Sequence, residues 1–169
     1  MNAETFLSQY FINKDTSCIS SHFVNGHEFA VVMEGNQRKL VKQSPDEIVE
    51  ESFHYTVQDL VGATKSARKI LKRSYKQVPV PFAPEKSIML IRCPSIDRFG
   101  CHWLVHSKII DIHPKGKKQT TAEMVNGHFL TVNLSFRQLH TQRMEASFVR
   151  EMILLRGEMQ PYIFSLQSL

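Results

Sequence analysis

The most regular pattern of apolar and polar positions lies between residues 84 and 112. Residues 88–91 form a continuous apolar run, typical of a strand covered on both faces, although a run this short could also belong to a buried helix. Pro84 and Pro94 flank the run and favour the strand. After a polar loop, Cys101, Trp103 and Val105 alternate with the residues between them, and this period of two predicts a second strand.

Farther along the chain, the inward-facing positions of this pattern shift. The apolar residues move to Ile110 and Ile112, and we expect a bulge or a strong bend near Ile109 to account for the shift. Short strands are also expected at residues 6–12 and 28–33, because turn-forming Asn, Asp, Ser and Gly residues lie between them.

A hairpin is expected later in the chain. Residues 120–125 and 128–134 form its strands, and Asn126-Gly127 between them strongly favours a tight hairpin turn. Its core face is expected to carry Leu130, Val132 and Leu134. With helices between the strands, the chain predicts a single α+β domain over residues 1–169, built on an antiparallel sheet that is open or partly closed like a barrel.

Two helices are expected as a pair over about residues 45–73. The first begins at Ser44-Pro45-Asp46-Glu47, where Ser44 can cap the helix and Glu47 completes a capping box, and it runs to about residue 55. The second begins at Asp59, a good N-cap residue, and runs to about residue 73.

A third helix is expected over about residues 135–155, with Ser135 as its N-cap. We expect its inward face to carry Leu139, Met144, Phe148, Met152 and Leu155. Its outer face is expected to carry His140, Arg143, Ser147 and Arg150, and we assign the two arginines to the surface or to a subunit contact.

The polar side of the second helix has charges of one sign. It carries Lys65, Arg68, Lys69, Lys72 and Arg73, and Lys76 follows shortly after. Solvated helix faces usually mix both signs in stabilising pairs four residues apart, and this face has none. We predict that these six residues contact DNA phosphates, with a solvated surface as the alternative.

Charge is also divided unevenly along the chain. Residues 1–58 have a net charge of −4, whereas residues 59–169 have a net charge of +9. Charge of one sign steers association with a polyanion, so the later part is expected to face nucleic acid or an anionic membrane. A basic turn with Lys115, Lys117 and Lys118 is a second candidate for contact with the DNA backbone.

The cellular compartment is indicated by what the sequence lacks. No apolar run exceeds five residues, far below the ~20 that span a bilayer, and the N-terminus lacks the pattern of a signal peptide. Three cysteines without a CxxC motif favour a reducing interior. We therefore expect a cytoplasmic protein.

Zinc binding and catalysis are the alternatives for the cysteines and histidines. By residue type, a zinc site could be formed by Cys93, Cys101, His102 and His106. Their spacing matches no common structural-zinc motif, and burial of Cys101 with Trp103 is the preferred interpretation. Catalysis by Cys101 with a histidine lacks any supporting motif. We expect no cofactor, no metal and no enzymatic activity.

Residues 40–153 resemble the competence transcription factor ComK family. The matching features occur in the same order along the chain: Glu51-Ser52 with Tyr55, Gly62 followed by ATKSARKIL, the apolar strand and polar loop before Cys101-x-Trp103 with His106 and Ile109, and Asn126-Gly127 with Leu134-Ser135-Phe136 and Gln142. Two positions differ from the family pattern: Lys65 is the nearest basic residue after Gly62, where an Arg is usual, and Glu145 occupies a position that is often Arg.

The resemblance implies a sequence-specific activator of DNA-uptake genes in the bacterial nucleoid. Members bind paired A/T-rich boxes as homodimers or larger homo-oligomers, largely through the minor groove, and act with RNA polymerase. Some are handed to an adaptor and a protease through an aromatic-apolar tail, which residues 157–169 match only loosely. The alternative, which the two departures support, is a protein-interaction module that has lost specific DNA binding.

Overall fold

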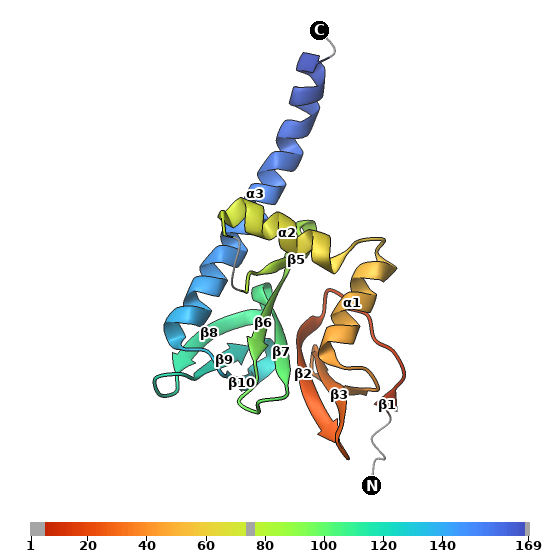
Figure 1. Cartoon of the computed structure of the whole chain (residues 1–169), viewed down its shortest axis with the longest axis vertical. Coiled ribbons are helices and arrows are strands. Elements are labelled where there is room, and N and C mark those ends of the chain that lie inside the picture. Colours follow the sequence, from red (N-terminus) through yellow and green to blue (C-terminus); the bar gives the residue numbers. More distant parts are fainter. Residues whose placement is uncertain (1–5, 74–76, 168–169) are drawn as a thin grey trace.

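The structure is a computed structural model that describes residues 6–73 and 77–167, with side chains described as far as Glu158 in the last helix. The described residues form two sheets and three α-helices (Figure 1). The larger sheet contains β1 (Phe6–Leu7), β2 (Thr16–Val24), β3 (His27–Glu34), β4 (Gln37–Val41), β5 (Val80–Ala83), β6 (Ile88–Pro94) and β7 (Cys101–Val105). The smaller sheet contains β8 (Ile109–Pro114), β9 (Thr120–Met124) and β10 (His128–Val132).

Both sheets are open. The strand order is β1-β4-β3-β2-β7-β6-β5 in the larger sheet and β10-β9-β8 in the smaller one. Adjacent strands pair antiparallel except β1 and β4, which are parallel. The predicted α+β class is confirmed, and neither sheet closes into a barrel.

The N-terminal strands differ from the prediction. The strand predicted at residues 6–12 is reduced to β1, while β2 and β4 were not predicted at all. Tyr10 and Ile12 are nevertheless buried, because the Ile12 N–H donates to Ser52 Oγ at 3.0 Å and ties this segment to a helix. The strand predicted at residues 28–33 is confirmed as part of β3.

The first two helices follow their local signals. α1 (Pro45–Tyr55) has the predicted bounds and the predicted capping box between Ser44 and Glu47. α2 (Leu60–Leu71) begins after Asp59, whose carboxylate accepts from the Gly62 N–H at 3.0 Å. It ends two residues earlier than predicted, because Lys72 adopts a left-handed conformation with φ of 56°.

The third helix is much longer than predicted. α3 (Phe136–Gln167) begins with reciprocal hydrogen bonds between Ser135 and Gln138, which cap its first turn. It does not end near residue 155 but continues to Gln167 and projects beyond the rest of the molecule (Figure 1). Over the described residues, no helix is both long and apolar enough to cross a bilayer.

The larger sheet is covered on both faces. Ile48, Val49 and Phe53 of α1 pack on one face, in a cluster that also contains Trp103. The other face packs against α3 and the smaller sheet. In β6, Ile88 and Leu90 belong to the first cluster and Met89 and Ile91 to the second, so the prediction of a strand buried on both faces is confirmed.

The shift near Ile109 is a change of sheet. A 3-10 turn at His106–Lys108 separates β7 from β8, and the register of β8 against β9 is irregular between Ile109 and Asp111. The predicted bulge or bend is therefore confirmed. Ile109 and Ile112 are buried, whereas Ile110 is exposed, so its predicted inward position is wrong.

The predicted faces of α3 are also wrong. Of the five residues predicted to face inward, Leu139 is fully buried and Met152 is half-buried, whereas Met144, Phe148 and Leu155 are exposed. Smaller residues, Ala146 and Val149, fill the contact with the sheets instead. The helix therefore has two apolar stripes, and the one with larger side chains faces outward.

Candidate nucleic-acid interface

The polar face of α2 presents its lysines to solvent. Ala67 and Ile70 are buried beneath the helix, which fixes its orientation on the molecule. Lys65, Lys69 and Lys72 are exposed on the opposite side. The apolar side of α2 is therefore buried and its lysines are exposed, as the sequence pattern predicts.

The two arginines of this face are held more tightly. Arg68 and Arg73 are half-buried, and the Nε of each finds no hydrogen-bond partner among the described residues. Arg73 forms an ion pair with Glu145 of α3, which joins the two helices. Glu145, one of the departures from the family pattern, thus neutralises part of the basic face. Lys76, the sixth predicted residue, lies outside the described residues.

The lysine turn connects β8 to β9. Gly116 has a φ of 81°, which favours glycine, and the Lys115 N–H donates to the Gln119 carbonyl at 2.9 Å to close the turn. Lys115, Lys117 and Lys118 are all exposed. The turn lies at the lower left in Figure 1, whereas α2 lies above the sheets. The two predicted sets of basic residues are therefore separate surfaces.

Hydrogen bonds gather further loops around the lysine turn. The Asn133 N–H donates to the Pro94 carbonyl at 2.9 Å, and Thr120 Oγ1 donates to the Leu134 carbonyl at 2.8 Å. The β6–β7 loop, the start of α3 and the lysine turn therefore meet at one end. This end adds the exposed Arg98 of the β6–β7 loop, whereas the exposed Arg137 of α3 lines a hollow with Arg73 and Gln77 beside the end of α2.

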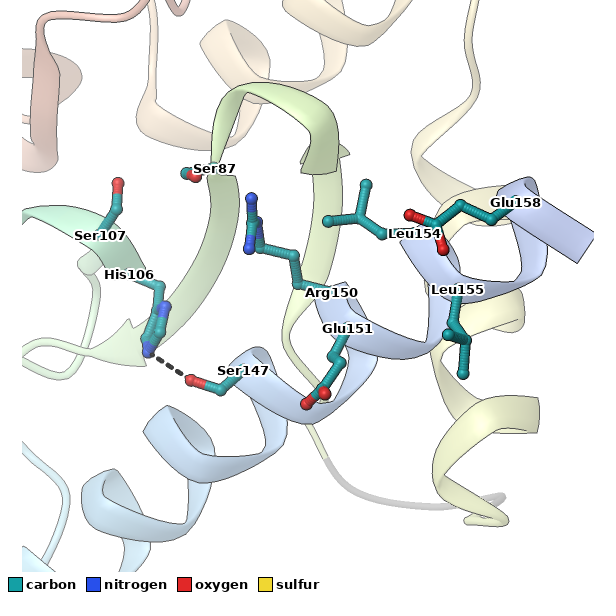
Figure 2. Close-up of a pocket in the computed structure, with 9 residues that line it drawn as sticks. All are labelled: Ser87, His106, Ser107, Ser147, Arg150, Glu151, Leu154, Leu155 and Glu158. Atoms are coloured by element: carbon teal, nitrogen blue, oxygen red, sulfur yellow. Dashed lines mark hydrogen bonds between the residues drawn. The ribbon is translucent and has the colours of Figure 1, made fainter.

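Arg143 and Arg150 were predicted to lie on the outer face of α3, but both side chains are partly buried against the rest of the protein. Arg150 Nε donates to the Pro84 carbonyl at 2.9 Å, and Arg143 Nε is buried. Arg150, His106 and Ser147 line the same hollow, which has a volume of about 560 Å³ (Figure 2). Ser147 Oγ lies 3.4 Å from His106 Nε2. Burial lowers the pKa of His106, and the two arginines lower it further.

The same hollow is of mixed charge. Glu151 and Glu158 line it together with Arg150 (Figure 2). Carboxylates close to an arginine repel phosphate groups, so this surface is a poor match for DNA.

The cysteines and histidines considered for zinc do not converge. Cys93 and Cys101 are buried in clusters on opposite faces of the larger sheet. Burial raises the pKa of the Cys93 thiol to about 12 and that of Cys101 to about 11, which disfavours the thiolate that a metal or a nucleophilic mechanism needs. His102 instead pairs with Ser20 at 2.8 Å. The structure does bring together a group that the sequence did not suggest, Asp111, His113 and Glu123, on the exposed face of the smaller sheet.

The sequence profile of one protein family, described as ComK protein, matches residues 7–158. The chain belongs to the ComK family. Comparisons with curated proteins and with solved structures give no match. The matched region includes α1, α2, both sheets and the body-contacting half of α3, so ComK membership extends well beyond the residues 40–153 on which the resemblance was based.

Membership of the ComK family indicates a competence transcription regulator. The lysines of α2 and the lysine turn lie inside the matched region. Both basic surfaces therefore belong to the part of the chain that is common to the ComK family.

Proposed function

We propose that this ComK protein is a DNA-binding transcriptional activator that recognises A/T-rich promoter boxes of DNA-uptake genes in the nucleoid, with RNA polymerase as its downstream partner. The observation that carries the proposal is the exposed, single-sign face of α2, where Lys65, Lys69 and Lys72 have no acidic neighbour on their helix. Such a face matches the regular phosphates of a duplex.

The two basic surfaces contribute separately. The β8–β9 turn, which carries Lys115, Lys117 and Lys118, lies well apart from α2 (Figure 1), so the two surfaces contact different phosphates. Because distant sites act independently, their contributions to the binding free energy add. Phosphate contacts do not depend on the base sequence, so the preference for A/T-rich duplex is assigned to contacts in its narrow minor groove, where the negative potential is enhanced.

Binding to A/T-rich duplex is expected to be at least about tenfold tighter than binding to G/C-rich duplex of the same length, since each unfavourable base pair costs about 1–3 kcal/mol. Fluorescence anisotropy with end-labelled duplexes at two salt concentrations measures both affinities. Equal and weak binding to the two duplexes would instead support a protein-interaction module that has lost specific DNA recognition.

We further propose that the protein self-associates through the outward stripe of α3. The stripe contains Met144, Phe148 and Leu155, whose exposed fractions are 61%, 48% and 48%. A second copy offers the same stripe, so a two-fold pair of helices would bury both at once. Paired A/T-rich boxes are the natural target of such a dimer.

Phe148→Glu is expected to convert the dimer to a monomer, because it places two charges in the apolar contact. Sedimentation velocity measures the change, and circular dichroism checks that the fold is kept. Phe129→Glu is the matched control, because Phe129 is 63% exposed and belongs to β10 and not to the stripe of α3. Equal effects of the two variants would show that the contact lies elsewhere.

A further inference from the structure

The β6–β7 loop, residues 95–100, has a fixed backbone. The Ser95 N–H donates to the Gly100 carbonyl at 3.1 Å, and the Asp97 carboxylate accepts from the Phe99 N–H at 3.2 Å. The loop is also tied to β2, because the Cys101 N–H donates to Ser21 Oγ at 2.8 Å. Gly100 allows this close approach, since a Cβ there would lie 2.9 Å from Ser21 Cβ. The loop is therefore held in one conformation at its base.

This fixed loop presents large apolar side chains to solvent. Phe99 is 80% exposed and Ile96 is 50% exposed. Exposed side chains such as Phe99 and Ile96 gain no free energy from burial, so they do not stabilise the fold. The residues that favour turns are Gly, Pro, Asn, Asp and Ser, so the loop does not need a phenylalanine to form its turn. Large apolar side chains on a rigid loop indicate a contact made with another molecule.

Basic side chains outnumber acidic ones on the loop and on the lysine turn. We define the loop surface as residues 95–100 and the lysine turn 115–118, whose flanking residues are joined through the segment before α3 by the hydrogen bonds described above. Its exposed charges are four basic side chains and one carboxylate, that of Asp97, which is turned back onto the loop backbone. An apolar tip surrounded by cations matches a polyanion that has an apolar interior.

We propose that Phe99 and Ile96 form a wedge that inserts between stacked base pairs from the minor groove and bends the duplex. DNA has anionic edges and an apolar interior, and a pyrimidine–purine step such as TA opens most readily. Arg98, between the two apolar residues, and the lysine turn contact the flanking phosphates. This inference rests on the proposed DNA binding and adds how the duplex is deformed.

The test separates bending from binding. An A/T-rich duplex carries fluorophores at both ends and 2-aminopurine at a TA step, so that energy transfer reports bending and 2-aminopurine emission reports loss of stacking. Wild-type protein is expected to bring the ends closer and to raise the emission, because inserted side chains kink DNA by roughly 20–90°. The double variant Ile96→Ala with Phe99→Ala is expected to lose both signals and to bind roughly tenfold more weakly.

The slope of affinity against salt is expected to stay unchanged in the double variant, because no charge is removed. Phe129→Ala, which removes an exposed phenylalanine from outside the loop surface, is the matched control and keeps both signals. Phe99→Trp keeps a large ring at this position and is expected to keep both the energy-transfer and the 2-aminopurine signal. The emission of the new tryptophan is expected to be quenched when its indole stacks on a base. Trp103 is buried, so its emission is expected to change little when DNA binds.

The outcomes distinguish the two proposals. If wild-type protein fails to bind the duplex, the proposed function is wrong. If it binds, and the double variant still bends the duplex and unstacks the TA step, the wedge is wrong. A double variant that changes only the oligomeric state, measured by sedimentation, would also overturn the wedge and assign the loop to a subunit contact.

Discussion

Replacing Trp103 by alanine is expected to lower the free energy of unfolding by about 3–5 kcal/mol. Its ring is buried between α1 and the larger sheet, and its indole N–H donates to Asp46 Oδ1 at 2.8 Å. Asp46 also accepts two hydrogen bonds from Arg92, both at 3.0 Å, so the tryptophan joins the start of α1 to β6 and β7. Thermal unfolding measures the effect, which corresponds to roughly 6–20 °C in Tm for a domain of this size.

The control for this variant is Phe129→Ala, which removes an aromatic ring of which 63% is exposed. Its effect is expected to stay within about 0.5 kcal/mol, since surface substitutions rarely do more. An unchanged Tm in Trp103→Ala would show that the ring is not buried in solution.

Acidification tests the charged part of the same network. Burial raises the pKa of Asp46, but hydrogen bonds from Arg92 and Trp103 outweigh it and hold the pKa below its usual value. A carboxyl with a lowered pKa contributes stability above the unfolded value of about 4, and this stability is lost as the pH falls through the folded value. Trp103→Ala removes one of these donors and should therefore flatten the acid dependence as well.

Elements with strong local signals could be predicted from the sequence. The capping box at Ser44 and Glu47 and the Asn126-Gly127 turn each depend on a few neighbouring residues, and both occur as expected. Asn126 and Gly127 both have positive φ, which that dipeptide tolerates better than most. Local chemistry specifies such features before any tertiary contact forms.

The strand β2 could not be predicted, because its polar residues are satisfied only in the folded protein. Ser17 Oγ donates to the Met33 carbonyl at 3.1 Å, and Ser21 Oγ donates to the Cys101 carbonyl at 3.1 Å. Ser20 pairs with His102. Without these partners, a stretch with three serines resembles a loop, although it forms a central strand of the larger sheet.

The faces of α3 were predicted wrongly because the helix has two apolar stripes. Period alone identifies both and cannot tell which one is buried. Packing decides in favour of Ala146 and Val149, whose small side chains suit close contact with the strands, and the larger Met144 and Phe148 remain outside. The same limit of local patterns applies to the candidate nucleic-acid interface. The basic face of α2 could be predicted from neighbouring residues, but the ion pair between Arg73 and Glu145 could not, because it joins residues 72 positions apart in the sequence.

Replacing Lys65, Lys69 and Lys72 by alanine is expected to flatten the dependence of DNA affinity on salt. Each lysine that neutralises a phosphate contributes about −0.9 to the slope of log K against log salt, so the triple variant should lose about 2.7 from it. The fall in affinity between about 50 and 200 mM salt should then be about 40-fold smaller than for wild-type protein. The loss should be similar on every sequence, because phosphates carry no sequence information.

The structure determines which residues belong in this variant. Arg68 and Arg73 are left intact, because the first has a buried Nε and the second pairs with Glu145, so their removal would disturb the α2–α3 contact as well as the charge. The matched control replaces Lys14, Lys42 and Lys86, which are also exposed and lie outside α2. Both variants lower the net charge by the same amount. If they flatten the salt dependence equally, DNA responds to overall charge and α2 is not in the interface. If only the α2 variant does so, the lysines of α2 contact the phosphates directly.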